Sequence, residues 1–300
     1  MEAAVSSFLN LVPVTLVQGL LYGFVALAVM IPFRLLAFPD LTSEGSFPLG
    51  ACVCAALLVV GVQPFAATPA AVAAGMLAGS ATAFIHLRFR INTLLAGILV
   101  MTILYSVNLR VLGKANVALL GTDTVLSLLA PELLTQVWLQ VAAFAVLTAA
   151  ALAALAWFLR TEIGLALRAV GANADLAPAL ALDPWRYIVF GLALAGGLAA
   201  LAGAIVAQLY GFADVHMGFG VLISGLAAVI IGETLLGRET VARQLAAPIV
   251  GSLLYYQLVS LGLAAGLQPS DLKLATGLFV LATLAAPALR RGAEPVRMRE

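Results

Sequence analysis

Residues 187–210 read YIVFGLALAGGLAALAGAIVAQLY and contain no charged side chain. About 20 such residues are enough for a helix to cross the hydrocarbon core of a bilayer. Other apolar runs, each bounded by charges, prolines or glycines, lie at residues 11–33, 46–62, 66–87, 91–111, 135–159, 219–236, 244–265 and 272–289. The sequence therefore predicts an all-α integral membrane protein of about nine transmembrane helices, with a range of eight to ten.

Composition leads to the same fold class. Of the 300 residues 63% are hydrophobic and only 10% are charged, and the mean hydropathy is +1.12. A soluble protein carries roughly 25% charged residues on its water-facing surface, so lipid must cover much of this chain. Nine spans leave only short loops, and we expect residues 1–300 to form a single transmembrane domain. The second run is short and follows a polar stretch, which predicts a short or broken second helix.

The basic residues predict the orientation, because cytoplasmic loops carry the excess of Lys and Arg. If the polar loop at residues 160–186 is cytoplasmic, only Arg110, Lys114 and Lys273 of the 15 basic residues fall outside. Those on the cytoplasmic side are Arg34, Arg88, Arg90, Arg160, Arg168, Arg186, Arg238, Arg243, Arg290, Arg291, Arg297 and Arg299. The N-terminus is therefore expected outside and the C-terminus in the cytoplasm.

The loop at residues 160–186 begins with a pattern typical of a short amphipathic helix. Thr161 can cap this helix, Glu162 suits its positive N-terminal end, and Gly171 can end it. A second short helix is predicted at residues 174–182. Two interpretations remain open, an interfacial connector that happens to be helical and a rigid element that docks into a cytoplasmic partner.

A second candidate site follows the first apolar run. The residues that form this polar cluster next to hydrocarbon are Asp40, Thr42, Ser43, Glu44 and Ser46. Carboxylates in such a position are costly unless they face water, a partner or a cavity, and transporters often build sites at discontinuous helices. The cluster is therefore a candidate translocation path. The alternative is a cytoplasmic turn in which Thr42 or Ser43 caps the second helix, because simple alternation of the spans places the break at the inner face.

Other polar residues give weaker indications. Glu233, near the inner end of the seventh run, is a candidate inner-face contact that either meets a partner or pairs with Arg238. Asp214 and His216 lie in the outer loop before that run, where an external binding protein could dock. No metal-ligand cluster and no catalytic residue is predicted.

Three stretches of the sequence resemble one protein family. TEIGLALRAVGANADLAPALALDPWR, residues 161–186, resembles the coupling-helix region of permeases from the branched-chain amino acid and ribose importer family. FPDLTSEGSFPLGA, residues 38–51, and GLAAVIIGETLLG, residues 225–237, resemble blocks of its subgroup for tryptophan, tyrosine and similar small organic substrates. The blocks follow the same order over essentially the whole chain.

The resemblance implies a type II importer-like permease of a bacterial ATP-binding-cassette (ABC) transporter in the cytoplasmic (inner) membrane. Two copies of the permease, or this chain and a paralogue, would form the pore. Two ATPase subunits would drive it, and a periplasmic or lipoprotein binding protein would deliver a small organic solute such as an amino acid. The positions that match the family's ATPase contact are Glu162, Gly164, Arg168, Ala169, Gly171 and Asn173. The chain contains no Gly-x-x-x-x-Gly-Lys-Ser/Thr loop, so neither a nucleotide nor another cofactor is expected in it, and no nucleic acid partner is expected either.

Two other classes of protein fit the sequence less well. An ion-coupled secondary transporter has a similar size, but it would place coupling acids within the membrane, whereas most charges here fall at span ends. Transport without any ATPase subunit would favour it. An intramembrane serine protease needs a Gly-x-Ser-Gly turn, and residues 223–225 lack the preceding glycine. We therefore expect a transport subunit rather than an enzyme.

Overall fold

The computed structural model describes residues 2–266, 271, 274, 277 and 278, and this part of the chain is almost entirely helical. In chain order the elements are α1 (Glu2–Met30), η1 (Ile31–Leu35), α2 (Ser43–Val59), α3 (Pro64–Phe89), α4 (Thr93–Leu112), β1 (Asn116–Ala118), α5 (Val125–Leu129), η2 (Pro131–Leu134), α6 (Val137–Phe158), α7 (Glu162–Ala172), η3 (Ala177–Leu180), α8 (Pro184–Tyr210), β2 (Phe212–Asp214), α9 (Val221–Leu236) and α10 (Val241–Ala264). η1 continues α1 as a π-helix, and η2 and η3 are short 3-10 turns. The predicted all-α membrane fold is thus confirmed for the described residues, except that two three-residue strands were not predicted.

Six helices are long and apolar enough to cross a membrane. They are Phe8–Leu35, Pro64–Phe89, Thr93–Leu112, Val137–Phe158, Pro184–Tyr210 and Val241–Ala264. The helices α2 and α9 are apolar but shorter, as expected for the short second helix. These helices correspond to eight of the nine predicted runs. The ninth run, 272–289, lies almost entirely outside the described residues, so the total of nine stays a prediction.

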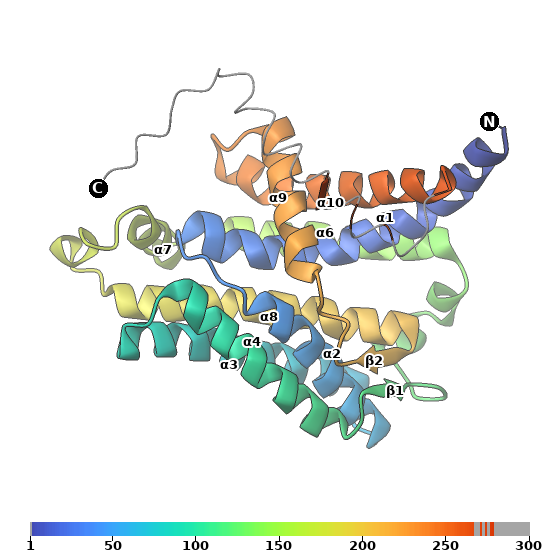
Figure 1. The fold of residues 1–300 in the computed structure, drawn as a ribbon, viewed down its shortest axis with the longest axis horizontal. Coiled ribbons are helices and arrows are strands. Elements are labelled where there is room, and N and C mark those ends of the chain that lie inside the picture. Colours follow the sequence, from blue (N-terminus) through green and yellow to red (C-terminus); the bar gives the residue numbers. More distant parts are fainter. Residues whose placement is uncertain (1, 267–270, 272–273, 275–276, 279–300) are drawn as a thin grey trace.

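The bundle has two ends: α1, α3 and α6 run toward one of them, and α4, α8 and α10 run away from it (Figure 1). We call one of them the arginine end. It holds η1, α7 and several helix termini with their arginines, namely Arg34, Arg88, Arg160, Arg186 and Arg243. The opposite end, which we call the strand end, holds the antiparallel pair of β1 and β2. In Figure 1 the arginine end lies at the left and the strand end at the right.

The arrangement of helices on either side of α2 is repeated, in the opposite direction, on either side of α9. The series α1, α2, α3 begins at the strand end, and the series α8, α9, α10 begins at the arginine end with the same order of long, short and long helix. α1 packs along α10 and α3 along α8. Between α3 and α8 the backbones approach so closely that Gly75 and Gly79 have no room for a Cβ atom. This inverted repeat places both short helices between the two halves.

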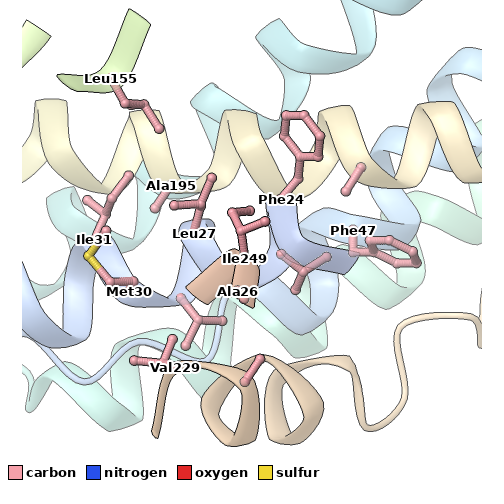
Figure 2. Close-up of a cluster of buried hydrophobic side chains, with 14 of the residues drawn as sticks. Phe24, Ala26, Leu27, Met30, Ile31, Phe47, Leu155, Ala195, Val229 and Ile249 are labelled. Atoms are coloured by element: carbon pink, nitrogen blue, oxygen red, sulfur yellow. The ribbon is translucent and has the colours of Figure 1, made fainter. Parts of the chain in front are cut away.

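The buried core connects the two halves around α1 (Figure 2). Phe24, Leu27 and Met30 of α1 are almost completely buried. They belong to one apolar cluster with Phe47 of α2 and Ile249 of α10. Because α1 is surrounded in this way, it fixes the position of the polar residues that follow it.

The chain after η1 enters the bundle before α2 begins. Asp40 and Leu41 lie against Gly97, four residues or about 6 Å into α4. Gly45 lies against Met101 and Leu104, near the middle of α4. The break therefore lies about one helical turn from the arginine end, and α2 is a partial helix that starts within the bundle.

Candidate functional site

The two short helices meet at Glu44. The Glu44 Oε1 atom accepts a hydrogen bond of 2.8 Å from the backbone N–H of Gly220, the residue before α9. Gly218 lies directly against the Glu44 carbonyl and leaves no room for a side chain. Gly220 has a φ of +84°, a conformation that favours glycine. The segment before α9 therefore returns from the strand end into the bundle and ends on the first turn of α2.

Asp40 fixes the segment between η1 and α2, which leads into this junction. Its side chain is buried, and Oδ1 accepts hydrogen bonds from the backbone N–H and the hydroxyl of Thr42. The Thr42 hydroxyl also lies 2.6 Å from the Thr82 hydroxyl of α3. Thr42 occupies the N-cap position of α2, but its side chain makes no capping bond to the helix. Asp40 and Thr42 thus hold the start of α2 against α3.

The five predicted path residues separate into two groups. Asp40, Thr42, Ser43 and Ser46 are all 2% exposed or less. Glu44 alone is partly exposed and lines a cavity of about 270 Å³. The buried residues build the junction, and Glu44 is the one that a solute in this cavity can contact.

The cavity lies between α2, α4 and the segment before α9. Its lining consists of Glu44, Gly45, Pro48, Met101, Thr102, Tyr105, Asn108, Val215, Gly218 and Phe219. The α4 residues of this lining were missed in the sequence, because the run 91–111 reads as an ordinary apolar span. Asn108, the one amide beyond the first turn of that run, was the available signal.

At the strand end the cavity borders a cluster of polar residues. His216 Nε2 lies 3.3 Å from the Tyr105 hydroxyl, and its Nδ1 lies 3.2 Å from Asp214 Oδ1. Burial by itself would raise the pKa of Asp214, but hydrogen bonds from the His216 backbone N–H and the Asn116 amide outweigh it. The pKa of Asp214 therefore lies below its ordinary value. Asp214 and His216, for which the sequence leaves open a solvated loop or a docking point for a binding protein, lie beside the cavity.

Glu233 joins α9 to η1 at the arginine end. Its Oε2 lies 2.7 Å from Arg34 Nη2 and 3.9 Å from Arg238 Nε. The predicted partner Arg238 is thus the more distant of two cations. The Arg34 contact links the end of the first long helix to the second short helix.

The helix α7 has the predicted start but not the predicted end. Thr161 Oγ1 accepts a hydrogen bond from the Gly164 N–H, which confirms the predicted cap. The expectation that Gly171 ends the helix is wrong, because α7 continues to Ala172 and Asn173 is its C-cap. Gly171 instead contacts the Leu35 carbonyl of η1 so closely that no Cβ fits. The second short helix predicted at 174–182 is present only as the shorter 3-10 helix η3, Ala177–Leu180.

The six predicted ATPase-contact residues do not share one face. Gly164 and Gly171 face the bundle, where they contact Leu159 and Leu35. Glu162 and Asn173 are exposed. The other two, Arg168 and Ala169, are partly exposed.

The solvent side of this region also carries apolar side chains that were missed. They are Ile163, Leu165, Leu176 and Leu180, each more than half exposed.

Within the described residues no group of three or more His, Cys, Asp or Glu side chains could hold a metal ion. Cys52 and Cys54 are buried free thiols. Cys54 accepts a hydrogen bond from the Gln208 amide, which supports a structural role for it. Neither the junction nor the arginine end of the described chain therefore offers a metal site.

Comparison with known proteins assigns the chain to a class of membrane permease. Residues 13–285 match the family described as the permease component of branched-chain amino acid transport systems, and the chain belongs to this family. It is 36% identical over 269 residues to the tyrosine transport system permease protein of Clostridioides difficile (strain R20291), across 89% of this chain and 88% of that protein. It is 34% identical over 282 residues to the uncharacterized protein RP368 of Rickettsia prowazekii (strain Madrid E), across 93% and 98%.

No solved structure matches the chain. The family resemblance drawn from the three sequence blocks is confirmed by these comparisons. The chain is therefore a multi-pass membrane permease, a transport component rather than an enzyme.

Proposed function

We propose that this chain is the transmembrane permease subunit of an ATP-driven importer for an amino acid. The family description and the name of the Clostridioides difficile relative support an amino acid as solute. In this proposal a separate ATPase subunit hydrolyses ATP, and a periplasmic or lipoprotein binding protein delivers the solute from outside. The arginine end faces the cytoplasm of a bacterial inner membrane, with the N-terminus outside and the C-terminus inside.

The observation that carries the proposal is a chain of contacts from α7 to the cavity. Gly171 seats α7 on η1 at Leu35. Arg34 of η1 pairs with Glu233 of α9, and the start of α9 is bonded to Glu44 in the cavity wall. These packed helices and two polar contacts form a contiguous network between α7 and the junction, of the kind that carries coupling between sites.

The outer side of α7 suits an ATPase surface. Ile163 and Leu165 are exposed apolar residues at the arginine end, beside the exposed Glu162. Apolar side chains that protrude from a charged, water-facing end are typical of a protein contact. Arg168, with its planar set of donors, can add hydrogen bonds to a partner. We infer that α7 and this surface form the coupling helix.

A second copy of the chain is proposed to complete the pore. The exposed side of α6 carries Trp138 and Trp157, which lie about 28 Å apart along the helix and suit the two membrane interfaces. We assign this side to lipid. Glu44, Tyr105 and His216 lie near the cavity and are at least partly exposed, and polar groups at such depth are expected to face water or protein rather than lipid. The cavity side is therefore assigned to a homodimer, or to a pair with a paralogue.

The experiment is a pull-down of the ATPase subunit with variants of α7. Arg168→Glu and Ala169→Trp should weaken ATPase association by about a hundredfold while the permease stays folded and inserted. Arg186→Glu is the matched control. Arg186 lies in the first turn of α8, outside α7, and pairs with Asp183, the N-cap of α8. Wild-type association in both α7 variants would refute the coupling assignment, and equal defects at all three positions would indicate general misfolding.

A further inference from the structure

Asn108 on α4 carries a buried acceptor without a partner. The side chain is 0% exposed, and its Nδ2 donates a 3.4 Å hydrogen bond to the Gly45 carbonyl. Its Oδ1 has no hydrogen-bond partner among the described residues. Reversing the amide would place two oxygens against each other, so the oxygen remains the free atom. Buried acceptors are rarely left unpaired. Asn108 lines the 270 Å³ cavity, but its Oδ1 has no accessible surface, so a solute in the cavity contacts Glu44 and not this oxygen.

Glu44 contributes a carboxylate to the same cavity. One oxygen accepts the Gly220 N–H, and the ion pairs found among the described residues do not include Glu44. A carboxylate at this depth without a cationic side chain is costly. A positively charged group in the cavity would relieve that cost.

The rest of the lining is apolar and aromatic. Pro48, Met101 and Phe219 lie in the cavity wall with the Tyr105 ring. Such a wall suits the apolar body of a solute, whereas Glu44 supplies the polar atoms that set its orientation. A cavity of about 270 Å³ is large enough for an amino acid.

We infer that this cavity binds the ammonium group of the transported amino acid, an inference that rests on the proposed function. The ammonium, which carries three donors and no acceptor, donates to the partly exposed Glu44 carboxylate. The solute side chain lies against Met101 and Phe219. Glu44 thereby both holds α9 through Gly220 and senses the solute.

The test measures binding to the purified full chain in lipid nanodiscs, without a binding protein that would impose its own specificity. Three probes are used: tyrosine, tyramine, which has the amine but no carboxylate, and 3-(4-hydroxyphenyl)propionate, which has the carboxylate but no amine. Tyrosine and tyramine should bind and compete, and the propionate should not. Absence of binding by all three, or equal binding of the propionate, overturns the inference.

The variants separate the charge from the junction. Glu44→Gln keeps an acceptor for the Gly220 N–H but removes the charge, and it should weaken tyramine binding at least about tenfold. Glu132→Gln, at an exposed glutamate of η2, is the control and should bind as the wild type does. Unchanged binding in Glu44→Gln with a wild-type melting temperature overturns the site.

The two proposals fail in different experiments. If the reconstituted wild type imports amino acid with ATP but binding does not depend on Glu44, the ammonium site is wrong and the importer stands. If the wild type binds tyramine through Glu44 but shows no ATP-driven uptake, the proposed importer is wrong.

Discussion

Exchange of the charges at Arg34 and Glu233 tests whether α9 is tied to η1. The side chain of Glu233 is 10% exposed and that of Arg34 is 40% exposed, with 2.7 Å between the paired atoms. Exposed pairs contribute about 0–1 kcal/mol, and breaking a fully buried pair costs about 3–5 kcal/mol. This half-buried pair should therefore contribute about 1–2 kcal/mol to the free energy of unfolding. Arg238 Nε lies 3.9 Å from Glu233 Oε2 and can replace part of the attraction that Arg34 provides. Arg34→Ala should therefore lower the free energy of unfolding by an amount near the lower end of this range.

The assay is a double-mutant cycle on the protein in nanodiscs. Arg34→Glu places a second carboxylate next to that of Glu233 and should lower the free energy of unfolding by about 2–3 kcal/mol. Adding Glu233→Arg should recover at least about 1 kcal/mol of that loss. ATP-driven uptake should fall in Arg34→Glu and partly return in the exchanged pair. The exposed pair of Arg243 and Glu239 is the control, with a coupling of about 0.3–0.5 kcal/mol. Additive losses of unfolding free energy for the changes at Arg34 and Glu233 would refute the proposed connection between η1 and α9. Full uptake in Arg34→Glu would refute it as well.

Three further predictions concern the junction, the orientation and pH. Thr42→Val and Thr82→Val should each lower the free energy of unfolding by about 1–2 kcal/mol. The double variant should lose less than the sum of the two losses, because both hydroxyls belong to one network. Strictly additive losses of unfolding free energy, measured by thermal melting, would contradict this. A cysteine at Thr122 should react with an impermeant maleimide in intact cells and one at Ala172 only after permeabilisation, and the reverse pattern would overturn the orientation. Because the pKa of Asp214 is lowered, its contribution to stability is present above the unfolded-state pKa of about 4 and is lost as pH falls through the folded value. Asp214→Asn should flatten the acid side of the melting curve against pH, and an unchanged curve would count against the hydrogen bonds at Asp214.

The sequence predicted the spans and the polar junction but not the depth of the junction. Hydropathy locates apolar runs, and simple alternation then treats each run as a full crossing. α2 and α9 are only 17 and 16 residues long, and each begins after a segment that turns back into the bundle. That turn depends on tertiary contacts such as Gly97 with Leu41 and Glu44 with Gly220, which no local pattern encodes.

Single residues explain the other differences. Thr161 was predicted correctly as a cap, because a cap bonds to backbone three residues away. Gly171 was misread because a glycine that ends a helix and one that permits a close contact look alike in sequence. Asn108 was missed because a single amide scarcely changes the hydropathy of an apolar run.

Uptake of radiolabelled amino acids into proteoliposomes tests the central claim most directly. The vesicles hold the chain and its ATPase, with the binding protein and solute on one side and ATP on the other. The account predicts uptake against a gradient that requires ATP, that persists when proton and sodium gradients are collapsed, and that is lost in Arg168→Glu. Uptake by the chain alone, driven by an ion gradient and indifferent to ATP, would contradict it and identify a secondary transporter.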